Sequence, residues 1–327
     1  MSRILVFVLL LFSVCSFGQQ IPQYSQFSRN QFAINPAAAG VENTPQISLA
    51  GRWQWLGVDD APRTTVLSFS MPLTIKPKYY NPGIRTSSAP IKINKDLSRN
   101  LKHCVGGQII ADQYGAFRKL ALSGSYAIHF PVGENNSFSV GLKAGLSNNA
   151  FLASKAQVLN VLDNSQLYTD NTYSNYISNQ SNKYILDLGA GMYFYGQGFY
   201  VGFAAQQLTR DIVEFGVGSA NFNPQVHYSL MGGYRWKLNN ELTLKPNLLL
   251  KYMNPAPLSI DVNLQAEYKE WMWIGVGYRH TDAVIGMFGL QVNNRFKIGY
   301  SFDFSISRFK KYSSGGHELM LGLNLGK

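Results

Sequence analysis

Much of the chain consists of stretches of about ten residues in which apolar and polar side chains alternate. In residues 258–269, apolar side chains stand at every second position from Leu258 to Tyr268, and polar side chains at every second position from Ser259 to Lys269. A period of two residues is typical of a β-strand whose two faces meet different surroundings. Strands of this length cross a bilayer when tilted, whereas strands of soluble proteins cluster near about five or six residues. The pattern predicts an all-β fold and favours strands that cross a membrane.

The same alternation recurs along the chain and predicts about fourteen strands. Their expected positions are residues 47–53, 64–72, 103–113, 117–130, 137–148, 184–194, 198–206, 226–238, 241–252, 258–269, 271–280, 284–292, 295–306 and 317–325. An even number of strands is usual in single-chain bacterial barrels and places both chain ends on the periplasmic side. The expected fold is a transmembrane antiparallel up-and-down β-barrel of the bacterial outer membrane. A soluble β protein is the alternative, because its strands also alternate.

Under this arrangement, the connections at the two ends of the barrel differ in length. Those expected in the periplasm are mostly tight turns, at residues 131–136, 195–197, 239–240, 270 and 293–294. Those expected outside are longer, at residues 54–63, 149–183, 207–225, 253–257 and 307–316. Tyrosine and tryptophan gather near strand ends, as in the aromatic girdles of outer-membrane barrels.

The first residues have the composition of a secretory signal peptide. A short basic start precedes an unbroken apolar run over residues 4–12, and Ser16 and Gly18 are small residues in position for cleavage. Cleavage after Gly18 removes Cys15 and leaves Cys104 alone, so no intrachain disulfide is expected. The predicted division of the chain is a signal peptide at residues 1–18, an N-terminal periplasmic or luminal segment at residues 19–46, and the barrel at residues 47–327.

One expected periplasmic connection, residues 73–102, is long and strongly basic. The whole chain has a formal net charge of +11. This connection alone carries seven Lys and Arg residues against Asp96 as its one acid. It is interpreted as a solvated loop, a hidden extra hairpin, or a docking loop for a partner. Under the docking interpretation, the candidate partner contacts are Lys76, Lys78, Arg85 and Lys92. A nucleic-acid partner is not expected, because the chain carries an export signal.

Charged side chains on the inward face predict a hydrated, ion-paired lumen that is too obstructed for a wide pore. A Lys or Arg facing lipid at mid-depth costs about 2–4 kcal/mol, whereas inside the barrel it can pair with an acid on a neighbouring strand. The residues expected to point inward are Lys119, Lys143, Lys245, Lys251, Arg295, Lys297, Asp187, Asp261, Glu267, Asp303 and Glu318.

The sequence offers little for catalysis or metal binding. Its five histidines are scattered without metal-ligand spacing, and no G-x-S-x-G motif occurs. His280, with Thr281 and Asp282 beside it, lies near the expected outer rim and is the one candidate for a catalytic histidine. The Asp-Asn pairs at 163–164 and 170–171 fit no calcium-loop template. We therefore predict no enzyme activity, no cofactor and no metal site.

Several sequence blocks in order along the chain resemble the PorP/SprF family of outer-membrane proteins of the type IX secretion and gliding-motility system in Bacteroidota. The opening block runs from Pro22 to Phe27 and continues with N-P-A-A-A-G at residues 35–40. Further blocks lie at residues 52–57, 61–64, 126–131, 248–252, 256–261, 298–307 and 312–322. The end, Leu325-Gly326-Lys327, departs from the more typical aromatic finish.

The resemblance implies a non-enzymatic component that binds protein partners and supports export or surface attachment of cargo such as adhesins. It implies outer-membrane lipid, type IX secretion components and secreted cargo as partners, with periplasmic lipoproteins as a further candidate. The motif residues Asn35, Pro36, Gly40, His317 and Glu318 are interpreted as structural, and Trp55 and Pro62 as candidate partner contacts. Two alternatives stay open: a porin-like channel for small solutes, and a structural barrel tied to the envelope through residues 73–102.

Overall fold

The structure is a computed structural model that describes residues 23–73, 101–152, 155, 162–163, 166–167, 183–209, 213–214, 221–222 and 225–326. The predicted signal peptide at residues 1–18, most of the basic connection 73–102 and most of the long loop 149–183 lie outside the described residues. No helix among the described residues is long and apolar enough to cross a membrane.

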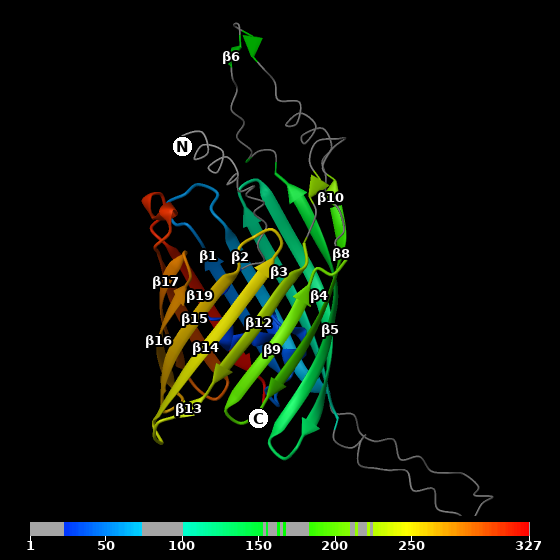
Figure 1. The fold of residues 1–327 in the computed structure, drawn as a ribbon, viewed down its shortest axis with the longest axis vertical. Helices are drawn as coiled ribbons and strands as arrows, with labels where there is room; N and C mark the ends of the chain where they lie inside the picture. The colour runs from blue at the N-terminus through cyan, green and yellow to red at the C-terminus, as the bar shows by residue number, and fades with distance from the viewer. Residues whose placement is uncertain are drawn as a thin grey trace, which may run out of the picture.

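The described part of the chain is dominated by long antiparallel strands (Figure 1). Those of the main sheet are β1 (Gln46–Trp53), β2 (Arg63–Leu73), β3 (Lys102–Tyr114), β4 (Phe117–Val132), β5 (Asn136–Phe151), β8 (Lys183–Tyr195), β9 (Phe199–Gln206), β12 (His227–Tyr234), β13 (Trp236–Lys237), β14 (Leu242–Met253), β15 (Ser259–Tyr268), β16 (Met272–Arg279), β17 (Ala283–Gln291), β18 (Phe296–Ser305) and β19 (Gly316–Asn324). Two short hairpins stand apart from it, β6 (Leu162–Asp163) with β7 (Gln166–Leu167) and β10 (Val213–Glu214) with β11 (Asn221–Phe222).

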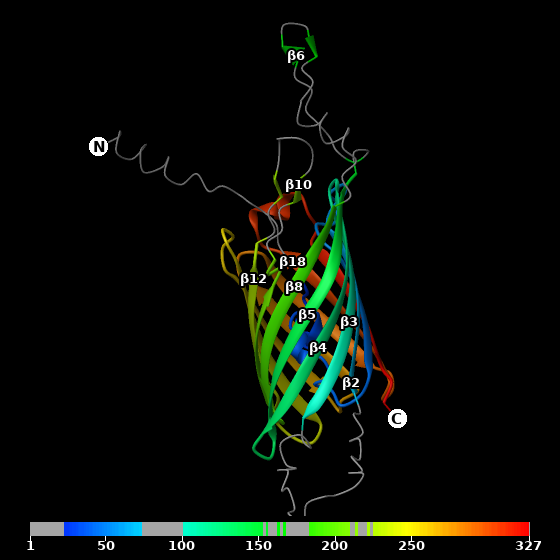
Figure 2. The ribbon, with the colours of Figure 1, turned by 90° about the vertical axis from the view of Figure 1, so that its right-hand side faces the viewer.

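The main sheet closes into a barrel. Each strand pairs with its neighbour in the chain, and β1 pairs with β19 from Gln46–Asn324 to Trp53–His317. The two-residue β13 follows β12 after Arg235, and both pair with β14, so together they make one crossing. The result is a closed antiparallel barrel of fourteen strands, as predicted. Closure leaves no unpaired sheet edge, and the two views show strongly tilted strands around one axis (Figure 2).

The wall is apolar outside and polar inside, the reverse of a soluble protein. On β15, Val262 and Leu264 are 47% and 45% exposed, whereas Asn263 and Gln265 between them are 1% and 0% exposed. The same alternation runs along the neighbouring strands. An outward apolar face and an inward polar face are what a barrel needs when lipid surrounds it. The predicted division into faces is therefore confirmed for these strands.

The barrel has two distinct ends. The C-terminal end carries Gln46, Asn324 and the tight turns, such as residues 269–271 between β15 and β16. The long-loop end carries the connections 54–62, 152–182, 207–226, 254–258 and 306–315. One inward assignment is wrong: Arg295 is exposed in the turn that precedes β18, because that strand begins one residue later, at Phe296.

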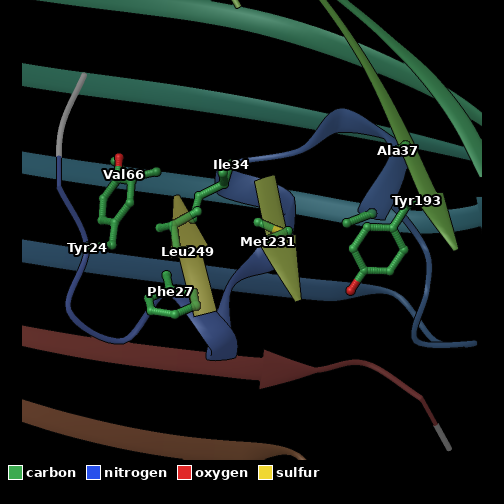
Figure 3. Packing of buried hydrophobic residues seen from close by; sticks show 9 residues of the cluster. Tyr24, Phe27, Ile34, Ala37, Val66, Tyr193, Met231 and Leu249 are labelled. Carbon is green, nitrogen blue, oxygen red and sulfur yellow. The ribbon is translucent and has the colours of Figure 1, made fainter. Parts of the chain in front are cut away.

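Residues 23–45, which precede β1, lie in the lumen and supply most of its apolar core. They form the short 3-10 helices η1 (Phe27–Arg29), η2 (Gln31–Ala33) and η3 (Pro36–Ala38). Tyr24, Phe27, Ile34, Ala37 and Ala38 from this segment pack against inward side chains of the wall, namely Val66, Tyr193, Met231 and Leu249 (Figure 3). Residues 23–45 are called the plug below.

Candidate functional site

The plug runs from the long-loop half of the lumen to the C-terminal end. The backbone carbonyl of Ile34 accepts a hydrogen bond of 2.5 Å from Nε2 of Gln206, the last residue of β9. At the other end, the backbone N–H of Leu325 donates a hydrogen bond of 2.8 Å to the carbonyl of Pro45. The plug therefore occupies the axis of the barrel before the chain turns into β1.

Buried ions line the wall beside the start of the plug. Nη2 of Arg52 lies 2.7 Å from Asp303 Oδ2, and its Nη1 lies 3.3 Å from Glu318 Oε2. Arg279 lies 2.6 Å from Asp261 and 2.9 Å from Asp303. These five side chains, called the ion cluster below, are at most 7% exposed and come from β1, β15, β16, β18 and β19. Lys251 adds a further cation 2.9 Å from Asp261, so charges of opposite sign balance.

The ion cluster forms hydrogen bonds with Ser25 of the plug. The two carboxylate oxygens of Glu318 accept hydrogen bonds from the backbone N–H groups of Ser25, at 2.7 Å, and Gln26, at 2.9 Å. The Ser25 hydroxyl donates to Asp303 at 2.7 Å and accepts from Arg52 at 2.5 Å. Hydrogen bonds with a charged partner are about twice as strong as neutral ones. This end of the plug is therefore attached to several strands at once.

Arg29 attaches the plug at a second point. Its guanidinium lies 3.0 Å from Glu267 and 4.2 Å from the centre of the Trp273 ring, and its Nε donates to Gln265 at 3.0 Å. Burial lowers the pKa of Arg29, and the negative charge of Glu267 opposes that effect. Burial also raises the pKa of Tyr24 well above its ordinary value, so this phenol is neutral in the lumen.

The N-P-A-A-A-G motif forms a third attachment, to strands β4, β5, β8 and β9. Asn35 Nδ2 donates to the carbonyls of Met192 and Phe203 at 3.0 and 3.2 Å, and Asn35 Oδ1 accepts from Ala37 N at 2.9 Å, which caps η3. The wall residue Gly191 permits this contact, because a Cβ there would collide with Asn35 Oδ1. Pro36 starts η3, where its fixed φ suits the first helical position.

Gly40 ends this motif at a point where the chain passes close to β3. Its φ of +70° lies in the left-handed region that glycine adopts without strain, and a Cβ there would strike Cys104. The neighbouring carbonyl of Ala39 lies 2.8 Å from His129 Nε2 on β4. The positive φ of Gly40 and its close approach to Cys104 both favour a residue without a side chain at this turn.

The remaining predicted site residues lie elsewhere. Trp55 and Pro62 are in the 54–62 connection at the long-loop end, with Trp55 42% exposed and its ring 4.8 Å from that of Phe309. His317 lies on β19 with Nδ1 2.5 Å from the Tyr300 hydroxyl. The structure thus brings Asn35, Pro36, Gly40 and Glu318 to the plug and leaves Trp55 and Pro62 at the rim. Lys76, Lys78, Arg85 and Lys92 lie outside the described residues.

Sequence reasoning missed Ser25, Arg52 and Arg279 as parts of this site. Arg279 shares its inward parity with Gly275 and Gly277, so the alternation could have placed it in the lumen. The plug itself carries no periodic signal, because it is built from isolated turns. Alternation alone therefore does not decide between the periplasm and the lumen, the two locations predicted for residues 19–46.

The plug separates two luminal pockets. One lies toward the long-loop end and is lined by Ala33 and Ile34 of the plug with Leu249 and Met253 of the wall. The other lies toward the C-terminal end, where Phe32 and Ala38 of the plug face polar wall residues that include Ser48, Ser70 and Lys297. Among the described residues, no group of three or more His, Cys, Asp or Glu is placed to hold a metal ion.

Several solved structures are similar to the chain. A TodX mutant monoaromatic hydrocarbon channel has a TM-score of 0.49 and 8% identity, covering 90% of this chain and 92% of its own. The Acinetobacter baumannii outer membrane protein Omp33 has a TM-score of 0.43 and 7% identity, with coverages of 88% and 100%. The KdgM porin has a TM-score of 0.39 and 8% identity, with coverages of 86% and 99%. Comparison with curated proteins gives no match.

A family model described as type IX secretion system membrane protein PorP/SprF matches residues 16–323, nearly the whole chain. This match agrees with the resemblance seen in the sequence blocks and with the lipid-facing barrel wall. The protein is an outer-membrane β-barrel, and the chain belongs to the PorP/SprF family of type IX secretion system membrane proteins.

Proposed function

We propose that this protein is a non-enzymatic component of the type IX secretion system that binds protein partners and supports export or surface attachment of specific cargo, such as adhesins. Family membership supports the link to secretion. The observation that carries the mode of action is the plug, which is bound to strands on opposite sides of the wall through Ser25, Arg29 and Asn35.

A plugged lumen favours partner binding at the two ends of the barrel over transport of solutes through it. Withdrawing the plug would expose the ion cluster and leave the backbone N–H groups of Ser25 and Gln26 without their acceptor, Glu318. Withdrawal would also separate Arg29 from Glu267, and removing one partner from a buried ion pair costs about 3–5 kcal/mol. Solute flow through the intact barrel would have to overcome several such attachments. Partner binding at either end requires none of them to break.

Two surfaces are the candidate partner sites under this proposal. Short turns of outer-membrane barrels usually lie in the periplasm and long loops outside the cell, so we infer that the long-loop end faces outside. There, Trp55 and Pro62 are available to cargo or to an outer component. On the periplasmic side, the basic connection with Lys76, Lys78, Arg85 and Lys92 is the candidate contact for periplasmic lipoproteins.

The direct test is deletion of the gene followed by a survey of surface proteins. The expected result is loss of one or a few adhesins from the surface, with restoration by the wild-type gene. Affinity purification from native membranes identifies the partners. A substitution of Trp55 by Ala should lower recovery of an outer partner, with Trp236→Ala at the C-terminal end as the matched control. Normal export and attachment of every surface adhesin in the deletion strain would end the proposal.

The periplasmic contact has its own test. Replacing Lys76, Lys78, Arg85 and Lys92 by Gln is expected to abolish co-purification of periplasmic lipoproteins while leaving the barrel folded. A control for charge loss elsewhere at the C-terminal end replaces Lys237 and Lys269 by Gln. If the loop variant binds lipoproteins as the wild type does, the docking role of this connection is wrong.

The second candidate function is a porin-like channel for small solutes. The observation in its favour is the polar inward face of the wall, which alone would suit a water-filled lumen. The two functions differ in the behaviour of the intact protein in a planar bilayer, since stable open conductance would favour the channel.

A further inference from the structure

The long-loop end carries an aromatic and basic patch that lies outside the plug. It is made by the 54–62 connection and the 306–315 connection, which holds the 3-10 helix η5 (Arg308–Lys311). Its rings are Trp55, Phe309 and Tyr312, and its cations are Arg308, Lys310 and Lys311. These six residues are called the rim patch.

Two kinds of contact hold the rim patch in shape. The backbones of the two connections pair through Leu56 N to Gly315 O and Ser314 N to Leu56 O, both 2.9 Å. The ring of Phe309 lies 4.8 Å from that of Trp55 and 5.9 Å from that of Tyr312. These contacts hold the backbone and the three rings of the patch in a defined arrangement, although the patch lies in loops.

The three cations of the rim patch, Arg308, Lys310 and Lys311, have exposed side chains. No ion pair joins Arg308, Lys310 or Lys311 to any residue that the structure describes. Two exposed cations at the opposite end are paired instead, with Arg235 2.5 Å from Glu270 and Lys269 3.0 Å from Glu241. A concentration of unpaired positive charge within four residues fits an anionic ligand.

The position of the patch indicates which anion it meets. Phe304, near the end of β18, and Ile306, just after it, lie directly before the patch in the chain. Their side chains are 56% and 43% exposed, as those of other lipid-facing residues are. The loop with η5 lies at the edge of the barrel above β17, on the rim and away from the axis (Figure 1). Tyr312 is 71% exposed there. The patch therefore lies where the apolar wall ends and the lipid head groups begin.

We propose that the rim patch binds the phosphorylated sugar head group of an outer-leaflet glycolipid. Arg308, Lys310 and Lys311 would pair with phosphate oxygens, and the exposed faces of Trp55 and Tyr312 would pack against the sugar rings. Arg and Lys both bind phosphate strongly through charge-assisted hydrogen bonds. Tyrosine and tryptophan suit an interface because each has an apolar ring and a polar atom. The proposal uses the outward orientation of the long-loop end inferred above, and it does not depend on the identity of any protein partner.

Native mass spectrometry of the full chain in detergent, titrated with phosphorylated lipid A, tests the proposal. The variant R308Q/K310Q/K311Q is expected to bind at least about tenfold more weakly than the wild type. Dephosphorylated lipid A is expected to bind the wild type with a similar loss, and inorganic phosphate should compete weakly. The variant K237Q/K269Q/R295Q, which removes the same charge at the C-terminal end, should stay within about twofold of the wild type. Heat-modified electrophoretic mobility verifies that each variant is folded.

The substitutions W55A/Y312A separate the sugar contact from the phosphate contact. They are expected to weaken lipid A binding by a smaller factor and to leave the dependence on phosphate intact. Equal binding of lipid A by the wild type and R308Q/K310Q/K311Q overturns the proposal, as does equal binding of phosphorylated and dephosphorylated lipid A. Loss of a protein partner with unchanged lipid A binding would also overturn it and assign the patch to protein docking. Failure of the secretion proposal would leave these lipid measurements unaffected.

Discussion

The carboxylate of Glu318 accepts a hydrogen bond of 2.7 Å from the backbone N–H of Ser25, although the two residues are 293 positions apart in the chain. Glu318 lies on the last strand, and Ser25 lies in the plug before the first strand. Because β19 pairs with β1, this contact ties the plug to the seam where the barrel closes. The plug and the closure of the barrel therefore depend on the same residues.

Replacing Glu318 by Gln should destabilise the barrel strongly. The change leaves Arg52 with one acid fewer and weakens the hydrogen bonds to Ser25 and Gln26. Breaking a buried ion pair costs about 3–5 kcal/mol. Urea titration in detergent, followed by tryptophan fluorescence, measures the loss.

The matched control for Glu318→Gln is Glu241→Gln. Glu241 pairs with Lys269 at 3.0 Å, but both side chains are about half exposed, at 53% and 49%. Exposed pairs contribute about 0–1 kcal/mol, so this variant should unfold close to the wild type. Similar unfolding of both variants would show that the ion cluster is not a major attachment.

Substitution of Gly191 by Ala should loosen the plug without changing any charge. The new methyl group would collide with Asn35 Oδ1. Overpacking of a tight site costs about 1–3 kcal/mol. Gly124→Ala is the control, because a Cβ at that outward glycine meets nothing within 4 Å. Limited proteolysis should cut the plug faster in Gly191→Ala than in Gly124→Ala, and equal rates would contradict this contact.

Because the outer face of the wall meets lipid, the free-energy cost of a charged side chain on that face should depend on its depth in the bilayer. Leu264 lies in the middle of β15 and faces outward, whereas Leu258 precedes that strand at the long-loop end. Arg at mid-depth costs about 2–4 kcal/mol, and near the interface about 0–1 kcal/mol. Folding titrations into lipid vesicles should therefore show a larger loss for Leu264→Arg than for Leu258→Arg. Equal losses would mean that Leu264 does not face the centre of the bilayer.

The strands were predictable because alternation reports directly on which face of a wall each side chain occupies. The expected strand 258–269 and the observed β15 (Ser259–Tyr268) differ by one residue at each end. The expected strand 226–238 is interrupted at Arg235, which separates β12 from β13. Such a local break leaves the alternation almost unchanged, so the pattern could not reveal it.

The site was predictable only in part. Parity placed Asp261, Asp303 and Glu318 inside, but it does not say which residues across the lumen they meet. The partners that decide the geometry, Ser25 and Arg52, come from the N-terminal segment and the first strand, far away in the chain. Contacts of this kind depend on closure of the barrel, which brings β1 beside β19. The family motif pointed to Asn35, Pro36 and Gly40 as structural residues, and the structure shows the contacts that each of them makes.

If the plug blocks the lumen, the intact protein conducts no solutes and acts through its surfaces. Planar-bilayer recording of the intact protein and of a variant lacking residues 23–43 tests it most directly. The intact protein should give no stable open conductance, and the shortened variant, once shown to be folded, should give long-lived open channels. Stable open channels from the intact protein, of the same size as those of the shortened variant, would contradict the claim.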